Sequence, residues 1–369
     1  MLFLLGSGLL FSCNFASESP EPTAETTHLW TWTQSECPPG TTWIPTGSYQ
    51  TGMRPPMPYG IVDTTGMERV ENPQQHCEKA LAQTPDASAC WVQTDLADPI
   101  VTLREATVEG YCMALRPFPE AGPYARDGLT TWDAQQFDRL LESGAYGPRR
   151  MCTYTEYEIA VSGPESNLRF LYGNEADPTK CAESQEVLIG SRPDCQNPET
   201  GILDHGAVTS QWVHLDEQIV EWACSENRPC RASGGARLDA RNPDGSLSMR
   251  YVVAGGTNRT QTRQAPYTPH TFHDHGQPSG PEGCDTWGWD DGATVCATPD
   301  PRYRECAQDP QLPQCEELRK WESNWSELLN FCQGRRITDC LNHGLSKVTG
   351  SPVDICPGSQ GVLGPGQGR

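Results

Sequence analysis

The sequence lacks several features that would assign it to a common functional class. No apolar run approaches the roughly 20 residues that a helix needs to cross a bilayer, and the uncharged run at residues 2–11 has only ten. No Cys-x-x-Cys pair occurs, although that spacing is typical of structural zinc sites. Gly-x-Ser-x-Gly, typical of serine hydrolases, is also absent. We therefore expect no membrane-spanning helix, no cysteine zinc module and no nucleophile of that kind.

Basic residues are scarce, and lysine is the scarcest. The chain has 27 Lys and Arg, only four of them Lys, against 48 Asp and Glu, which gives a formal net charge of −21 at pH 7. Such a charge repels the phosphates of nucleic acids and anionic lipid headgroups at close range. We therefore expect no nucleic-acid partner, whereas divalent cations and basic partners are compatible with this charge.

Cysteine, in contrast, is abundant, with 17 residues in 369. Without Cys13, sixteen remain, and that even number allows eight bridges. This density is typical of proteins from oxidising compartments. Because only 36% of the residues are hydrophobic, we expect disulfides to carry much of the order. The sequence leaves their connectivity open.

The N-terminus indicates export. The apolar run of residues 2–11 has the length of a signal-peptide core, and the Leu-Phe-Ser-Cys that ends at Cys13 resembles the lipobox of bacterial lipoproteins. That resemblance implies acylation of Cys13 and attachment to the bacterial cell envelope, and Asn14 favours the outer over the inner membrane. Residues 14–36, rich in Pro, Ser, Thr and Glu, are predicted to be a disordered tether. The alternative is an ordinary cleaved signal, with Cys13 in a disulfide.

Residues 37–299 are predicted to form one irregular α+β domain. Thr131 as N-cap and apolar residues at helical spacing predict a helix over residues 132–143. Thr153 followed by Glu156 forms a capping box that predicts a second helix over residues 154–162. Strands are predicted in the β-branched runs at residues 100–103, 186–189 and 251–253.

Residues 300–369 are predicted to be a small Cys-rich helical extension with a flexible tail. Leu318, Trp321, Trp325, Leu328 and Leu329 recur at three- and four-residue spacing and predict an amphipathic helix over residues 316–331. The extension contains five cysteines, and because five is odd, we expect at least one to bridge back to the preceding domain.

The most informative stretch is residues 149–160, Arg-Arg-Met-Cys-Thr-Tyr-Thr-Glu-Tyr-Glu-Ile-Ala. It resembles the R-L-P/C-T-E-x-E-W-E-x-A signature of the formylglycine-generating enzyme, or sulfatase-modifying factor, family. In that family the signature opens a helix, and here it coincides with the capping box at Thr153. Further segments are similar to family motifs and occur in family order: residues 43–52, 129–134, 170–175, 219–222, 253–257 and 292–296.

This resemblance implies an irregular α+β fold related to C-type lectins. Catalytic members use two cysteines, shortly after an Arg-Gly-Gly-Ser motif, to bind copper. Those positions fall near Thr260 and Ala265, and neither side chain supplies a thiolate for Cu(I). The His-x3-His-x-Glu pattern of the related iron enzymes is also absent. We therefore expect a divergent member without formylglycine-generating activity.

The resemblance also implies a calcium site in the loop that contains Gln218 and Glu221. An amide oxygen and a carboxylate are suitable donors for this ion. The alternative is that Glu221 is an ordinary loop carboxylate or pairs with an arginine.

A second metal hypothesis concerns His270, His273 and His275. In an extended segment His273 and His275 point to the same face, and three imidazoles suit zinc, copper or non-haem iron. A hydrogen-bonded loop is the interpretation that we prefer. Asp204-His205 and the His214/Asp216 pair come without a placed serine and indicate no nucleophile.

Trp287 and Trp289, flanked by aspartates, are compatible with a carbohydrate platform, but a buried structural role is the interpretation that we prefer. Taken together, the sequence favours an envelope-anchored binding or scaffold module with a glycan or protein ligand. The alternatives are a metal-dependent oxidoreductase with a relocated histidine site and a structural component of an envelope coat.

Overall fold

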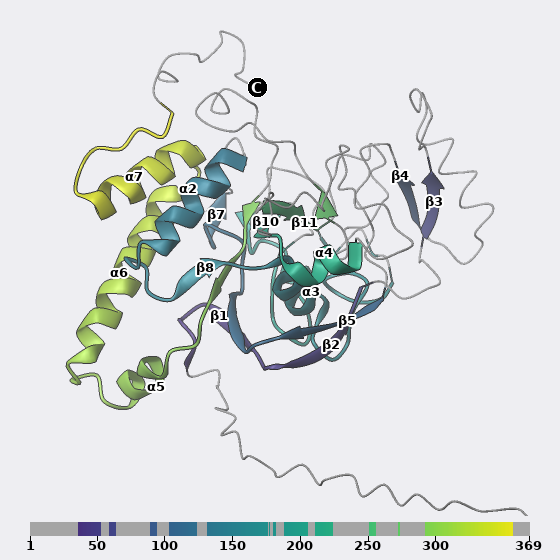
Figure 1. Cartoon of the computed structure of the whole chain (residues 1–369), viewed down its shortest axis with the longest axis horizontal. Helices are drawn as coiled ribbons and strands as arrows, with labels where there is room; N and C mark the ends of the chain where they lie inside the picture. The colour runs from purple at the N-terminus through teal and green to yellow at the C-terminus, as the bar shows by residue number, and fades with distance from the viewer. Residues whose placement is uncertain are drawn as a thin grey trace, which may run out of the picture. The chain divides into compact units, whose positions relative to one another are not determined.

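In a computed structural model the chain divides into two units, Met1–Thr31 and Trp32–Arg369. The structure describes parts of the second unit, which begins with strands, has strands and helices interspersed in its middle and ends in three helices (Figure 1). The described residues are 36–52, 59–63, 89–93, 103–123, 131–175, 177, 180–181, 188–205, 211–223, 251–255, 272–273 and 292–356.

The fold is mixed α+β, as the sequence predicts, with small sheets and six helices in these ranges. One four-stranded sheet is antiparallel throughout. Its strands, in spatial order, are β1 (Thr41–Ile44), β6 (Tyr111–Ala114), β14 (Val295–Ala297) and β8 (Arg149–Met151).

A second four-stranded sheet joins segments from the later half of the chain. Its first three strands are antiparallel, and the last pair is parallel. They are β12 (Phe272–His273), β11 (Tyr251–Ala254), β10 (Gln211–His214) and β13 (Gly292–Ala293). The remaining strands form the pairs β2 (Gly47–Thr51) with β5 (Arg104–Val108), β3 (Tyr59–Asp63) with β4 (Ala89–Gln93), and β7 (Gly122–Pro123) with β9 (Leu188–Ile189).

Side-chain alternation in the second sheet divides the core into two layers. Successive residues of a strand face opposite sides. Val213 and Val252 belong to the cluster that contains α3 (Tyr154–Ser162), whereas Trp212 and Val253 belong to the cluster that contains α2 (Thr131–Glu142). The sheet is therefore apolar on both faces, with one helix against each.

The helix α3 confirms the prediction over residues 154–162. The Glu156 N–H donates to Thr153 Oγ1 (3.2 Å), and the Thr153 N–H donates to Glu156 Oε2 (2.9 Å), so both bonds of the capping box are formed. All nine residues of the helix are buried. α3 is therefore a central core helix rather than a surface helix.

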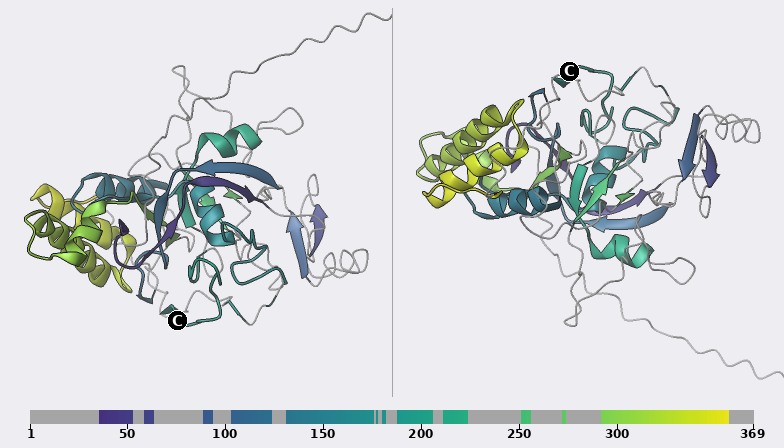
Figure 2. Two further views of the ribbon diagram at one scale, coloured as in Figure 1. Left: turned by 90° about the horizontal axis from the view of Figure 1, so that it is seen from below. Right: turned by 90° about the horizontal axis from the view of Figure 1, so that it is seen from above.

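The sequence predicts Thr131 as the N-cap of a helix over residues 132–143. In the structure Thr131 is instead the first residue of α2, which ends at Glu142. The predicted C-terminal helix is α6 (Gln314–Cys332). The sequence reading missed three helices, α4 (Glu217–Ala223), α5 (Pro301–Gln308) and α7 (Ile337–Thr349). Residues of α2, α6 and α7 share the second core cluster, and these helices lie together in two views (Figure 2).

The strand predictions agree with the structure only in part. The run at 251–253 lies in β11, and the run at 186–189 ends in β9. The run at 100–103 ends at Leu103, an exposed residue directly before β5, and residues 100–102 lie outside the described ranges.

Five disulfides are described, in agreement with a structural role for the cysteines. They are Cys37–Cys112, Cys152–Cys296, Cys181–Cys195, Cys306–Cys315 and Cys332–Cys340. Cys356 is disulfide-bonded as well. The other four cysteines after residue 299 pair with each other, so Cys356 bonds to an earlier part of the chain, as the odd number predicts.

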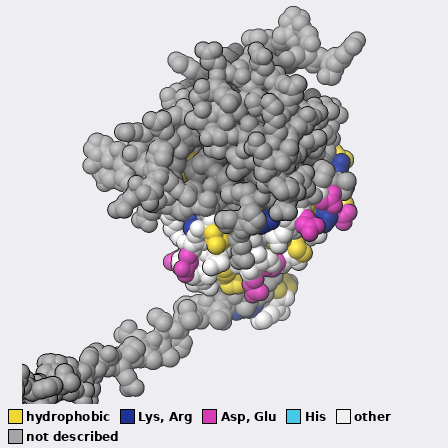
Figure 3. Space-filling view, turned by 90° about the vertical axis from the view of Figure 1, so that its right-hand side faces the viewer, with side chains coloured by type: hydrophobic (Ala, Val, Ile, Leu, Met, Phe, Trp, Pro, Cys, Tyr) yellow, Lys and Arg dark blue, Asp and Glu magenta, His cyan; other side chains and the backbone are white. Residues whose placement is uncertain are grey.

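Among the helices that the structure describes, none combines the length and apolarity needed to span a bilayer. On the face shown in Figure 3, acidic and basic side chains of the described part lie next to each other. Cys13, the predicted lipidation residue, and the predicted tether up to residue 35 lie outside the ranges that the structure describes.

Candidate functional site

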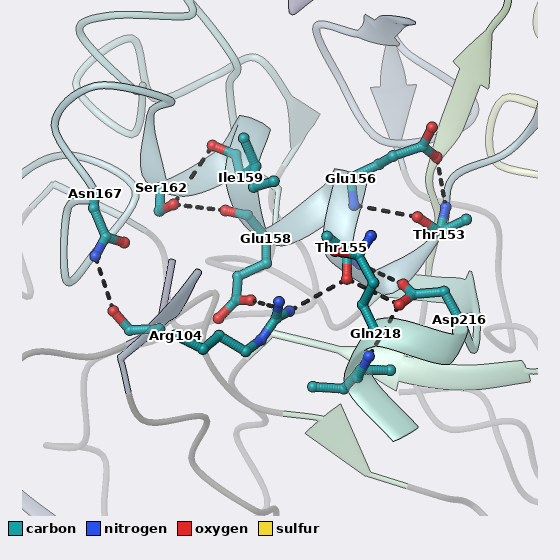
Figure 4. A network of polar contacts seen from close by, with 12 residues as sticks. Arg104, Thr153, Thr155, Glu156, Glu158, Ile159, Ser162, Asn167, Asp216 and Gln218 are labelled. Carbon is teal, nitrogen blue, oxygen red and sulfur yellow. Dashed lines mark hydrogen bonds and ion pairs between the residues drawn. The ribbon is translucent and has the colours of Figure 1, made fainter. Parts of the chain in front are cut away.

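The signature segment at residues 149–160 is the natural place to look for a site. It forms β8 and most of α3, and polar contacts extend along the helix from Thr153 to Ser162 (Figure 4). Its cysteine, Cys152, is fully buried and bonded to Cys296 at the end of the antiparallel sheet. The disulfide therefore fixes the segment to β14.

Arg150 and Glu156 form the first ion pair of this network. The guanidinium donates from Nη1 to Oε2 (2.7 Å) and from Nη2 to Oε1 (2.5 Å), a bidentate arrangement. Burial works to lower the pKa of Arg150, but the hydrogen bond and the charge of Glu156 outweigh it and raise the pKa. Since Glu156 also accepts from the Thr153 N–H, its carboxylate serves the helix cap and the ion pair at once.

The second ion pair joins β5 to α3. Arg104 Nη2 donates to Glu158 Oε2 (2.9 Å) and to Thr155 Oγ1 (3.3 Å). The side chains are 6% and 0% exposed, so the pair is almost dry. Loss of one partner of such a pair leaves a buried charge without compensation. This contact therefore fixes β5 on the helix.

Asp216 joins the N-termini of two helices. Its Oδ1 accepts from the Ile219 N–H (3.1 Å), which caps α4, and from Thr155 Oγ1 (2.9 Å), while Oδ2 accepts from the Thr155 N–H (2.8 Å) in the first turn of α3. Burial raises the pKa of Asp216, while these hydrogen bonds and Arg104 act to lower it. One carboxylate thus satisfies backbone donors that two helices leave free.

The arginines and glutamates of residues 149–160 are therefore paired inside the chain, whereas the buried Tyr157 hydroxyl has no hydrogen-bond partner in the part that the structure describes. Arg149 pairs with Glu322 of α6 (2.7 Å) in the same way. The arrangement can hold a helix, two strands and a C-terminal helix rigidly together. It offers a frame for other segments rather than a set of open catalytic groups.

A second polar cluster, which sequence reasoning missed, lies on the other face of the sheet. Asp138 of α2 is 1% exposed, and its two oxygens face His214 Nε2 (3.1 Å) and the Tyr251 hydroxyl, which donates (2.9 Å). His214 is half-buried, at 22%. A buried carboxylate therefore lies within ion-pair distance of the imidazole, although the contact lacks hydrogen-bond geometry. The pairing joins residues 76 positions apart, so no local pattern could have revealed it.

The side chains of Asp204 and His205, which are adjacent in the sequence, contact different parts of the fold. His205 is fully buried, and burial lowers its pKa to about 3. Its ring nitrogens contact the Ala114 carbonyl (3.2 Å) and Thr294 Oγ1 (3.3 Å). Asp204 accepts from the Gly190 N–H (2.6 Å), and burial raises its pKa to about 6. The two residues serve different neighbours, and His205 is a neutral core histidine.

Gln218 is the one predicted calcium ligand whose side chain is described. Its amide donates to the Thr107 carbonyl (2.7 Å) and accepts from the Thr107 N–H (2.8 Å), so that it pairs with the backbone of β5 as a neighbouring strand would. The side chain thus has a structural partner at the edge of the β2–β5 pair. Glu221 lies in α4, and its side chain is outside the description.

The other predicted site residues fall mostly outside the described ranges. His273 lies in β12, where it pairs with Val253 through the backbone, and its side chain is not described. Residues outside the ranges altogether are His270, His275, Trp287, Trp289, Thr260 and Ala265. In the ranges that are described, no group of three or more His, Cys, Asp or Glu side chains is arranged to hold a metal ion.

Comparisons with known proteins add no relative to this picture. No protein-family model matches the chain, and no curated protein matches it either.

Proposed function

We propose that the chain is an envelope-anchored, non-catalytic relative of the sulfatase-modifying factors that acts as a binding or scaffold module. The proposal includes a C-type-lectin-like fold and a lipid anchor at Cys13. The observation that carries it is the internal use of the signature's polar side chains, because Arg150, Glu156 and Glu158 are all held in ion pairs around α3.

A frame of this kind suits recognition. Disulfides and buried ion pairs fix the short helices and strands, and binding residues are commonly found on the connections that such a frame positions. The sequence adds a reason against copper chemistry, since Thr260 and Ala265 stand at the positions expected for the two thiolates. A recognition function keeps the family's frame and needs no thiolate pair.

The lipid anchor is tested by metabolic labelling of the full chain with radioactive palmitate in a bacterial host. We expect label in the membrane fraction, mainly the outer membrane, and loss of label in Cys13→Ser. Label that is absent from the wild type, or that persists in Cys13→Ser, would contradict the anchor. An unlabelled protein in the soluble fraction would support an ordinary cleaved signal.

Ligand binding is tested with the full chain, purified oxidised in detergent and presented to a panel of envelope polysaccharides and peptidoglycan fragments. We expect saturable binding of one glycan class that is lost in the variant Trp287→Ala/Trp289→Ala. The matched control is Trp43→Ala, a tryptophan of β1 outside the predicted platform. Conversion of a cysteine-containing sulfatase peptide to formylglycine by the wild type would contradict a non-catalytic role.

The proposal also includes a calcium site, with Glu221 as one ligand. If the ion has a role, chelation lowers the melting temperature of the wild type, and Glu221→Gln removes that response. A melting temperature that EDTA leaves unchanged would count against calcium.

A metal-dependent oxidoreductase is the second candidate. What supports it is the imidazole of His214, 3.1 Å from Asp138 Oδ1, in the same sheet as the backbone of His273. Metal analysis of the purified chain tests this second candidate. About one equivalent of copper, iron or zinc in the wild type, and its loss in His273→Ala/His275→Ala, would favour the oxidoreductase. If the chain binds neither a metal nor a ligand, the result would favour the third possibility, a structural component of an envelope coat.

A further inference from the structure

The end of the β2–β5 pair brings two buried polar side chains to the same face. Thr51 and Arg104 are direct partners in this antiparallel pair, and the side chains of directly opposite residues point to the same side. Their strand neighbours Gln50 and Glu105 are exposed on the other face. Thr51 is fully buried, and the side chain of Arg104 is 6% exposed. Both therefore lie between the strand pair and α3, where Arg104 meets Glu158.

A third buried polar side chain comes from the turn after α3. Asn167 is 4% exposed, and its N–H donates to the Gly163 carbonyl (2.9 Å). Its side chain reaches the end of β2, where Nδ2 donates to the Gly52 carbonyl (3.0 Å; Figure 4). Because a carbonyl only accepts, this bond fixes the amide so that Oδ1 points away from Gly52. Asn167 therefore joins the turn to the residue that follows Thr51.

Each of these three side chains has one polar atom without a protein partner. In the part of the chain that the structure describes, Thr51 Oγ1, Asn167 Oδ1 and Arg104 Nε are buried and form no hydrogen bond. Buried polar groups that lack a protein partner are usually satisfied by an ordered water. The three atoms come from segments that contact one another, so one small ligand can reach all of them.

The chemistry of the three atoms selects the ligand. Arg104 Nε–H can only donate, Asn167 Oδ1 can only accept, and the Thr51 hydroxyl can do either. A ligand that satisfies all three must therefore both donate and accept. The charge of Arg104 opposes a metal cation, and the neighbouring carboxylate of Glu158 opposes an anion. Water meets these conditions, and three hydrogen bonds are typical of a buried water.

We propose that Thr51, Arg104 and Asn167 bind one water molecule, which joins β2, β5 and the turn after α3. The water accepts from Arg104 Nε and donates to Asn167 Oδ1, and its third hydrogen bond is with the Thr51 hydroxyl. It completes the hydrogen bonding of Arg104, whose Nη2 already donates to Glu158 and Thr155. This inference does not depend on the binding or scaffold role proposed above.

A crystal structure of the full chain, at a resolution that shows ordered waters, tests the site directly. We expect one water within about 3.2 Å of all three atoms. A site without water, a water that reaches fewer than all three atoms, or a direct hydrogen bond between Thr51 Oγ1 and Asn167 Oδ1 would overturn the proposal. This measurement uses the wild type, so it does not depend on the folding of any variant.

The variant Thr51→Val tests the same site in solution, because the sign of its effect depends on the water. If the hydroxyl binds the water, valine removes one of the water's three bonds, and the unfolding equilibrium constant should rise about fivefold. If the hydroxyl has no partner, valine removes an unsatisfied polar group at nearly the same volume, and the unfolding constant stays the same or falls. Urea denaturation of both proteins distinguishes these outcomes.

The matched control is Thr107→Val. Thr107 lies on the exposed face of the same strand pair, where its hydroxyl contacts Ser48 Oγ (2.8 Å). Valine suits a strand position, so the unfolding constant should change about twofold or less. An unfolding constant of Thr51→Val that does not rise, or an equal rise in Thr107→Val, would overturn the bridging role of the water.

Discussion

The main part of the unit and its C-terminal helices use the same two devices, disulfides and ion pairs, in opposite ways. In the main part, Cys37–Cys112 and Cys152–Cys296 join residues 75 and 144 positions apart. In the helices, Cys306–Cys315 and Cys332–Cys340 span 9 and 8 positions. A bridge restricts the unfolded chain more when the loop that it closes is longer. These two bridges of the main part therefore restrict long loops, and the two bridges within the helices fix local turns. The division is not complete, because Cys181–Cys195 of the main part spans 14 positions and Cys356 bonds outside the C-terminal helices.

The ion pairs show the same contrast. Arg104–Glu158 is almost completely buried, whereas Lys347 and Glu327, on α7 and α6, are 35% and 52% exposed. A buried pair has lost its water and depends on both partners. An exposed pair keeps much of its hydration and contributes little to stability. A variant in each region can therefore be matched with a variant in the other.

The largest expected effect comes from the bridges. All four cysteines of Cys152–Cys296 and Cys332–Cys340 are fully buried, so replacement by alanine removes the same atoms from both sites. From loop length, Cys152→Ala/Cys296→Ala should lower the free energy of unfolding by about 5 kcal/mol and Cys332→Ala/Cys340→Ala by about 2.5 kcal/mol. Urea denaturation of both variants measures this. Equal losses would mean that loop length does not distinguish the two regions.

The next effect concerns the buried ion pair. Arg104→Ala leaves Glu158 charged and buried, so the free energy of unfolding should fall by about 3 kcal/mol or more. Lys347→Ala, its exposed counterpart, should cost less than about 1 kcal/mol. The double variant Arg104→Met/Glu158→Met should be more stable than Arg104→Ala, because it removes the unpaired charge. If Arg104→Ala costs no more than Lys347→Ala, the buried pair does not fix β5.

A smaller difference in stability is expected between variants at the N-termini of helices in the two regions. Thr153 caps α3 through its hydroxyl group, whereas α7 begins after Arg336 without a side-chain cap. Thr153→Ala should cost about 1 kcal/mol of stability. Arg336→Ala removes an exposed ion pair with Asp339 and no side-chain cap, and it should cost clearly less. Thermal unfolding of both variants measures the difference, and a larger loss in Arg336→Ala would reverse the ranking.

The sequence predicted best what depends on neighbouring residues. The capping box of Thr153 and Glu156 is complete within four positions, so α3 was predicted with the right bounds. The apolar spacing of residues 316–331 predicted α6 to within two residues at each end. The α7 helix was missed because its buried face includes Gly344, a residue that weakens isolated helices. A Cβ there would lie 2.7 Å from a methyl group of Leu140, so glycine lets α7 approach α2 closely.

The polar clusters were beyond the reach of the sequence because each depends on long-range contacts. His214 was considered with Asp216, two residues away, but its partner is Asp138 of α2. Asp216 instead joins the starts of α3 and α4. Glu120 gives no local signal at all: its partner is the indole of Trp325, 205 residues later in the chain. Spacing along the chain thus predicted elements, and packing between elements decided the partners.

The smallest expected effect lies in the exposed pair of the C-terminal helices. The hydrogen bond from Lys347 and the charges of Lys347 and His343 hold the pKa of Glu327 below its usual value of 4.5. A carboxylate with a lowered folded-state pKa stabilises the fold above its unfolded pKa, and this contribution is lost as the pH falls through the folded value. Glu327→Gln should therefore cost a few tenths of a kcal/mol at most at pH 7 in low salt.

The same variant should show no measurable loss at pH 3 or in 1 M salt, because protonation or screening has already removed the attraction. Urea denaturation of the wild type and Glu327→Gln under the three conditions measures this. A loss comparable to that of Arg104→Ala, or one that salt leaves unchanged, would mean that this pair is as closely integrated as the buried one. The contrast between the two regions would then rest on their disulfides alone.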